Sequence, residues 1–438
     1  MPRSRRADPL DVADSEERFR AEVRRHLPRN FAAHLVHGLL GQTGFRLLNA
    51  PTFVPAYVHL LSGSDLAVGL ARALQSLGMS LSPILGATAI EHRRRVLRVG
   101  FVVGGLMRLQ VLGIALAAFL LPPRAALAAV LLLLGLFGFF LGMQGVVFNF
   151  LLSKVIPVEG RGRLLGLRNA LAGLTAAGVA VLGGHWVEHD ALGNGFAATF
   201  LAAFALTTAG LVCLVFVREP ATPRVRDAVP ARERLRDLPD LLRADPAFTR
   251  YFVARALGTM GRMSVPFSVI YAGTKLPIGG QRLGALTVAF VMAQSAVNLL
   301  WGWIADRSGF RLVFLLAEAV WIASAVLLLA TSEYAVLLLV MVGLGAGVGG
   351  FMMAGQNLVL EFGARHDLPL RIAVANSTAD LVGAIGPLGA GILATAAGYR
   401  AVFGTAIAFQ LAALVVMGLC VDEPRHRGGR SASAQAAE

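Results

Sequence analysis

The sequence predicts an all-α integral membrane protein with twelve transmembrane helices in two pseudo-symmetric six-helix bundles. The first observation is composition: 56% of the 438 residues are hydrophobic and 15% are charged, with a mean hydropathy of +0.67. A soluble chain rarely buries so much apolar surface. The second is length, because each apolar run has the roughly 20 residues that a helix needs to cross a bilayer. The third is a repeat that relates the two halves.

The apolar runs fall into two groups of six. They lie near residues 31–60, 66–90, 96–121, 125–151, 164–187, 196–217, 248–272, 283–304, 312–331, 335–360, 372–396 and 401–420. The longest break follows the sixth run and separates the groups. We therefore divide the chain into an N-terminal tail with an amphipathic helix, a first bundle, a linker, a second bundle and a disordered tail, at residues 1–30, 31–217, 218–247, 248–420 and 421–438.

The N-terminal tail contains a short amphipathic pattern. In SEERFRAEVRRHL, Phe19, Val23 and Leu27 recur every fourth residue opposite arginines, and Ser15 can cap the start of a helix. This pattern predicts a helix lying on the anionic inner leaflet, or alternatively a helix that binds a partner protein. The leucines of the linker suggest the same contact with the membrane; they are Leu235, Leu238, Leu241 and Leu242.

The basic residues indicate how the chain is oriented. An even number of spans places both termini on one side, and Lys and Arg gather in the loops of that side, which predicts cytoplasmic termini. We expect a multi-pass protein of the cell membrane, inner or plasma, embedded in the lipid bilayer. Although the formal net charge is +14, the basic residues lie between apolar runs, so nucleic-acid binding is not expected. The two cysteines have no ligand-like spacing, and no metal or cofactor is expected.

The repeat is clearest in the first span of each half. GQTGFRLLNAP at residues 41–51 and GTMGRMSVP at residues 258–266 both contain two glycines three residues apart, then an arginine and a proline. Tyr57 and Tyr271 follow at similar offsets. Two halves related in this way are typical of transporters that hold a substrate between them near the middle of the membrane.

One further motif resembles a known family. GWIADRSGFR at residues 302–311 is similar to the signature that the major facilitator superfamily carries between spans two and three, here repeated between spans eight and nine. The resemblance covers residues 30–420 and implies that the loop latches a cytoplasmic gate. The first-half copy, GATAIEHRRR, has Ile90 in place of the aspartate. The gate residues we assign are Gly302, Asp306, Gly309, Arg311, Glu91 and, near the outer end of span two, Arg72. Ordinary loop charge is the alternative.

Two arginines lie deep in apolar spans. Arg46 lies about 22 Å into span one, too deep for easy snorkelling, and Arg262 lies at the matching depth of span seven. The family resemblance implies that both line a central cavity and face each other. Guanidinium groups suit a carboxylate or phosphate, so we expect an anion to bind there. The alternative is that both arginines form structural pairs with buried carboxylates.

Other polar residues complete the expected site. Those assigned to substrate binding with the two arginines are Gln42, Asn49, Arg255, Gln294, Asn298 and Gln356. Asp380 in span eleven is the expected proton-coupling carboxylate. Glu318 and Arg108 lie in spans that the resemblance makes peripheral, and we expect packing roles for them.

Together these features predict a secondary active transporter that moves a small anionic solute by alternating access. Its expected partners are the solute and a coupling proton, and the resemblance implies a monomer. No GxxxxGK phosphate-binding loop is present, so we expect neither ATP drive nor enzymatic activity. The alternatives are efflux of lipophilic drugs or lysolipids and, third, a non-transporting membrane receptor or enzyme.

Overall fold

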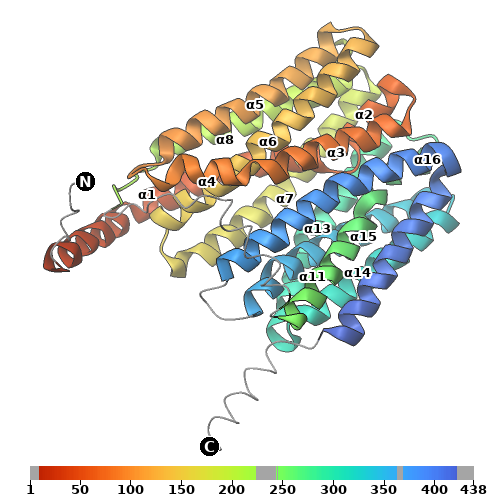
Figure 1. The fold of residues 1–438 in the computed structure, drawn as a ribbon. Helices are drawn as coiled ribbons and strands as arrows, with labels where there is room; N and C mark the ends of the chain where they lie inside the picture. The colour runs from red at the N-terminus through yellow and green to blue at the C-terminus, as the bar shows by residue number, and fades with distance from the viewer. Residues whose placement is uncertain (1–8, 223–242, 244, 363–367, 422–438) are drawn as a thin grey trace, which may run out of the picture.

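The computed structural model describes residues 9–222, 243, 245–362 and 368–421. In this part of the chain the secondary structure is helical, without strands, and the long helices run side by side in two groups (Figure 1). The expectation of an all-α membrane protein is confirmed. Among the described residues, nine helices are long and apolar enough to cross a membrane.

The helices follow the predicted spans. The first half contains α1 (Pro9–Asn49), α2 (Phe53–Ser62), α3 (Asp65–Leu81), α4 (Pro83–Glu91), α5 (Leu97–Leu120), α6 (Pro123–Val155), α7 (Val158–Glu188) and α8 (Gly195–Cys213). The second half contains α11 (Pro246–Gly261), α12 (Ser268–Gly273), α13 (Gly280–Ser308), α14 (Phe310–Ala330), α15 (Tyr334–Leu358) and α16 (Leu368–Cys420). Three spans are broken into helix pairs, α1–α2, α3–α4 and α11–α12. Helix α16 contains two spans that meet at Gly398, whose φ of 78° favours glycine. With each helix pair counted as one span and α16 as two, the described residues form twelve spans.

Two of the broken spans carry the deep arginines at their breaks. Helix α1 ends at Asn49, with Arg46 in its last turn. Helix α11 ends at Gly261, and the 3-10 turn Arg262–Phe267 follows it. Pro51 and Pro266 lie next to these ends, where the missing N–H of proline disfavours a continuing α-helix. Each guanidinium therefore lies near a helix C-terminus, whose partial negative charge stabilises a cation.

The repeat is visible in the packing of side chains. In each half a tyrosine after the break contacts two aromatic rings, one turn apart, in the last span of its own half. Tyr57 contacts Phe196 and Phe200, with ring centroids at 5.2 and 5.5 Å, and Tyr271 contacts Tyr399 and Phe403, at 5.6 and 5.4 Å. The two halves are thus built alike, as their sequences indicate.

The bundles meet tightly on one side of the molecule. We call this the far side, because it lies away from the side on which α1 begins and α16 ends. A Cβ added to Gly184 of α7 would lie 2.5 Å from the Gly280 carbonyl oxygen of α13. A Cβ added to Gly69 of α3 would lie 2.3 Å from the Pro387 carbonyl oxygen of α16. Glycine permits this close approach of the backbones, which closes the far side.

Polar contacts between the bundles lie on the same side. Tyr399 donates to Asp65 at 2.7 Å, and the hydroxyls of Thr287 and Thr52 are 2.8 Å apart. The carboxylate of Glu188 accepts a hydrogen bond from a backbone N–H at the start of α13 at 3.2 Å. These contacts connect the first bundle to the second between the middle of the molecule and its far side.

The N-terminal segment differs from its prediction. Helix α1 begins at Pro9 and continues past Pro28 into the first span, so Ser15 lies inside the helix and does not cap it. Extending an existing helix costs far less than starting a separate one, which favours the continuous form. The linker leucines, within 223–242, and the tail after Val421 lie outside the described residues.

An ion pair joins the beginnings of spans seven and eleven. Arg371 donates to Asp245 at 2.5 Å, and Asp245 also accepts a hydrogen bond from the Phe248 backbone N–H at 3.1 Å as the N-cap of α11. Burial alone would raise the pKa of Asp245, but these hydrogen bonds outweigh burial and hold the pKa below its usual value. The charged pair therefore stabilises the second bundle.

The pair makes stability depend on pH. Because the folded-state pKa of Asp245 is depressed, its contribution is present above the unfolded pKa of about 3.9 and is lost as the pH falls through the lower folded value. We expect the melting temperature of the detergent-purified protein to fall with acidification more steeply than that of Asp245→Asn. Parallel melting curves for the two proteins would contradict this role.

Candidate functional site

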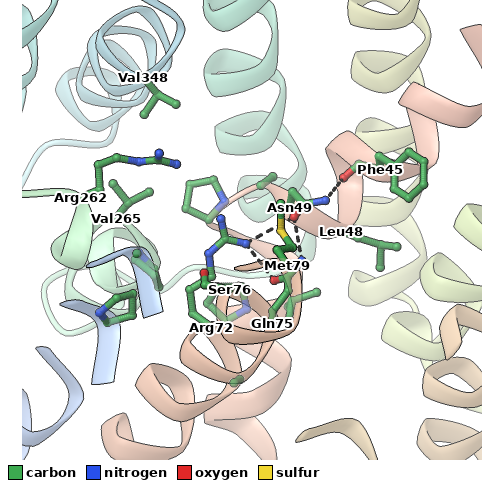
Figure 2. A pocket seen from close by; sticks show the side chains of 18 of the residues that line it. Phe45, Leu48, Asn49, Arg72, Gln75, Ser76, Met79, Arg262, Val265 and Val348 are labelled. Atoms are coloured by element: carbon green, nitrogen blue, oxygen red, sulfur yellow. Dashed lines mark hydrogen bonds between the residues drawn. The ribbon is translucent and has the colours of Figure 1, made fainter. Parts of the chain in front are cut away.

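A cavity of about 460 Å³ lies between the two bundles (Figure 2). Its lining includes residues of α1, α3, α6, α13, α15, α16 and the 3-10 turn after α11, so both halves contribute to it. Its volume is typical of a small-molecule site. Among the described residues that line it are three arginines, Arg46, Arg72 and Arg262, and no aspartate or glutamate. The rest of the lining is mostly apolar.

Arg46 reaches from α1 to the opposite bundle. It donates to the Ser295 hydroxyl of α13 and, at 3.4 Å, to the Asn169 carbonyl oxygen of α7. Both acceptors are neutral, and no carboxylate pairs with Arg46 among the described residues. Its positive charge is therefore not cancelled by a described neighbour. The contact with Ser295 was not expected, because a lone serine in an apolar span does not stand out, and a backbone carbonyl such as that of Asn169 leaves no mark in the sequence.

Arg72 belongs to a hydrogen-bonded group on the first bundle. It donates to Gln75 at 2.8 Å and to Asn49 at 3.3 Å, and Gln75 donates to the same Asn49 oxygen at 2.9 Å (Figure 2). Asn49 donates in turn to the Phe45 carbonyl oxygen at 2.9 Å. These bonds orient the guanidinium within the cavity. Arg72, assigned to a gate from the sequence, thus lines the cavity beside the residues assigned to binding.

Arg262 lines the cavity from the second bundle. It extends from the 3-10 turn toward the cavity (Figure 2), and one guanidinium nitrogen lies 3.4 Å from the sulfur of Met352 on α15. Gln42 and Gln294 line the same space. Thr259 also lines it and was not anticipated, because a lone threonine in an apolar helix carries little signal.

Three other residues assigned from the sequence stand apart from the lining: Arg255, Asn298 and Gln356. Arg255 is buried and lies 3.4 Å from the Tyr251 hydroxyl, to which it donates. Asn298 is half-buried and Gln356 is exposed, and neither lines the cavity. The side chain of Asp380 lies outside the described part of the structure.

The gate residues occupy the ends of helices. Asp306 is exposed in the last turn of α13, and Gly309 follows that helix with a φ of 84°. Arg311 donates to the carbonyl oxygens of Met417 and Gly418, at 3.2 and 2.6 Å, near the C-terminus of α16. Arg311 therefore fastens α14 to α16 within the second bundle.

The two remaining gate residues, Glu91 and Gly302, lie on α4 and α13. Glu91 is half-buried at the end of α4. Gly302 lies within α13, where an added Cβ would meet open space. Both residues lie toward the side on which α1 begins, away from the tight glycine contacts that the described residues make on the far side.

Comparison with known proteins identifies a family and similar solved structures. The family model of the Major Facilitator Superfamily matches residues 38–271 and 251–438. A search of curated proteins found no match. Among solved structures, the D-xylose-proton symporter is similar at a TM-score of 0.71 with 13% identity, covering 91% of this chain and 99% of that chain.

The nucleoside transporter NupG is similar at a TM-score of 0.64 with 14% identity, covering 88% of this chain and 97% of that one. A mutant of NupG has a TM-score of 0.70 with 12% identity, covering 88% and 98%. At these low identities the TM-scores show a shared fold. The two matches to the family model correspond to the two repeated halves and together span nearly the whole chain. The chain belongs to the major facilitator superfamily and is a secondary transporter rather than an enzyme.

Proposed function

We propose that the protein carries a small organic anion, with a carboxylate or phosphate group, by alternating access around the central cavity. The proposal is based on the charge of the cavity lining, which contains three arginines and, among the described residues, no carboxylate. Guanidinium groups that line an otherwise apolar cavity favour a ligand that brings negative charge. The apolar part of the lining accommodates the carbon body of the solute.

The two bundles divide the recognition between them. Arg46 and the group formed by Arg72, Gln75 and Asn49 offer N–H donors from the first bundle. Arg262 offers donors from the second bundle. An anion held by both sides draws the bundles together, so binding is linked to the rocking motion that alternating access requires. In this proposal the protein acts as a monomer in the cell membrane, its termini are cytoplasmic, and a proton accompanies the anion.

The similar solved structures suggest a neutral solute as the alternative to an anion, and the uptake experiment below distinguishes the two. Their names describe transport of nucleosides and of xylose, which are neutral. A neutral solute would offer the guanidinium groups of the lining no negative charge. Neutral solutes therefore serve as the contrasting probes.

The test is uptake into proteoliposomes of labelled inorganic phosphate, lactate, glycerol phosphate, xylose and uridine. We expect uptake of one or more anions, and a loss of about 10–100-fold in Arg46→Gln and Arg262→Gln, the equivalent of a charged hydrogen bond of about 1.5–3 kcal/mol. Arg124→Gln, at an exposed arginine in the first turn of α6, is the matched control and should transport normally.

Other outcomes identify the other functions. Uptake of xylose or uridine that excess anion does not inhibit would overturn the anion proposal. Export of a lipophilic dye or lysolipid, without anion flux, would favour the efflux function instead. In either case the secondary transporter remains and only its solute changes.

A further inference from the structure

We propose that His185 and His189 bind a transition-metal ion, such as Zn²⁺, Ni²⁺ or Cu²⁺, at the far-side end of α7. His185 lies in the last turn of this helix and His189 is its C-cap residue, so the two side chains share one face. The same spacing of two histidines on a helix holds zinc in the H-E-x-x-H motif. The inference goes beyond the proposed function, because it depends neither on the solute nor on the central cavity.

The two imidazole rings already lie together. Their centroids are 4.2 Å apart and their planes are inclined by 39°. Both residues are exposed, so an ion can reach them from solvent. Small rotations of the side chains bring one nitrogen of each ring to about 2.0–2.1 Å from a common ion, the distance at which imidazole binds zinc. The cysteines predict no metal site, but a pair of histidines can hold an ion without them.

The hydrogen bond of His189 leaves one ring nitrogen for a metal. Its Nδ1 lies 3.0 Å from the His185 carbonyl oxygen, and its backbone N–H donates to the same oxygen at 3.1 Å. Because a carbonyl oxygen only accepts, Nδ1 carries the proton in this contact, and Nε2 of the neutral ring keeps its lone pair. Metal-bound histidines are usually oriented by a bond of this kind. The helix end therefore positions one ligand before an ion arrives.

The surroundings of the two histidines favour a cation. The end of a helix presents partial negative charge, and the exposed residues Glu188 and Asp190 flank His189 in the chain. The chain from 169 to 217 contains no lysine or arginine. On α13, the guanidinium of Arg282 donates to the Pro277 carbonyl oxygen at 2.7 Å and lies over the ring of Tyr334.

The ligand set indicates which ions bind. Imidazole suits Zn²⁺, Ni²⁺ and Cu²⁺, whereas Mg²⁺ and Ca²⁺ prefer oxygen ligands. The described part of the chain contains no group of three or more His, Cys, Asp or Glu residues that could hold a metal. Water therefore fills the remaining coordination positions, as it does the open position of many zinc sites.

Another histidine shows that the hydrogen bond alone does not make a metal site. His92 is the exposed C-cap residue of α4, and its Nδ1 lies 3.2 Å from the Thr88 carbonyl oxygen. It thus matches His189 in its place on the helix and in its acceptor four residues earlier. That earlier residue is a threonine, however, so His92 has no second imidazole beside it and provides a matched control.

A bound ion spans the turn of α7 on which α13 rests. Between the two histidines, the Glu188 carboxylate accepts a hydrogen bond from the Gln281 backbone N–H at 3.2 Å. A Cβ added to Gly280 would lie 2.3 Å from the Glu188 backbone nitrogen. Chelation by both histidines requires the helical form of this turn and therefore stabilises it. The ion thus stiffens the far-side contact between α7 and α13.

The first test is binding of Cu²⁺ to the purified protein, after removal of any affinity tag, followed by electron paramagnetic resonance. We expect a spectrum with two imidazole nitrogens on the ion, and displacement of the ion by Zn²⁺ but not by Mg²⁺. His185→Gln and His189→Gln should each lower the affinity about 100-fold or more, because each removes half of a chelate. His92→Gln should bind like the parent. Equal affinity in the parent and both variants, or a spectrum with a single imidazole, would overturn the proposal.

The second test is hydrogen exchange with and without Zn²⁺. We expect Zn²⁺ to slow exchange at the amides of the last turn of α7 and the first turn of α13 in the parent and in His92→Gln. His185→Gln should show no such change, while melting like the parent in the absence of metal. Exchange in the parent that Zn²⁺ leaves unaltered at both helix ends would contradict the stiffening of this contact.

Discussion

Replacing Gly184 by valine is expected to abolish transport. A Cβ at this position would lie 2.5 Å from the Gly280 carbonyl oxygen and 2.9 Å from the Gly284 Cα, both backbone atoms that cannot turn away. The bundles can then no longer close on the far side, while alternating access requires each side to close in turn. Each 1.4 kcal/mol of added strain lowers the population of the closed form about tenfold, so we expect uptake to fall by about 100-fold or more.

The measurement combines uptake with a distance. Spin labels at His189 and Gln281, both exposed on the far side, should lie farther apart in Gly184→Val than in the parent, once Cys213 and Cys420 are replaced. Gly178→Val is the matched control on the same helix, because an added Cβ there meets nothing within 4 Å. Unchanged uptake and an unchanged distance in Gly184→Val would show that the far side does not need this contact.

Removing the side chain of Glu219, which lies just after the first bundle, is expected to lower the free energy of unfolding more than any other substitution proposed for this protein. Its carboxylate accepts hydrogen bonds from the Lys154 ammonium at 2.7 Å and from the backbone N–H groups of Val96 and Leu97, at 2.7 and 2.9 Å, at the beginning of α5. The Lys154 and Glu219 side chains are 4% and 3% exposed. Glu219→Ala leaves a buried ammonium without its counter-charge and two N–H groups without acceptors, a cost of about 3–5 kcal/mol.

The check is thermal unfolding in detergent. We expect Glu219→Ala to melt well below the parent, and Glu219→Gln, which keeps an acceptor for the helix N-terminus, to melt between them. The double variant Lys154→Met, Glu219→Leu should recover part of the loss, because no uncompensated charge remains buried. A melting temperature for Glu219→Ala equal to that of the parent would refute this role.

The lysine of this pair shows where sequence reasoning reaches its limit. Lys154 begins the basic stretch KVIPVEGRGR, whose charge predicts a loop on the cytoplasmic side. The structure instead buries it against Glu219, 65 residues later in the chain. Charge counts predict which side of the membrane a loop occupies, but they contain no information on which distant residue a particular ammonium will meet.

The deep arginines mark the opposite case. Arg46 and Arg262 stand out because an arginine in the middle of an apolar span is costly, and each occupies the same place in a repeated segment. The structure places both in the lining of one cavity. Arg255 has the same residue type and a favourable spacing, yet it lies buried beside Tyr251, outside that lining. Spacing along an α-helix indicates a shared face, whereas the α-helix ends at Gly261 and a 3-10 turn with a different side-chain spacing begins at Arg262.

The sequence by itself determined the helical class, the number of spans and the duplication of the halves, because hydropathy and repeats are properties of consecutive residues and survive any arrangement of the helices. The tertiary structure alone decided that the far side is closed, that Arg311 fastens α14 to α16, and that the Glu318 carboxyl group is buried with no hydrogen-bond partner among the described residues. Each of these depends on which helix surfaces meet. In a bilayer that choice rests on close packing and on hydrogen bonds between residues far apart in the chain, and no local pattern encodes it.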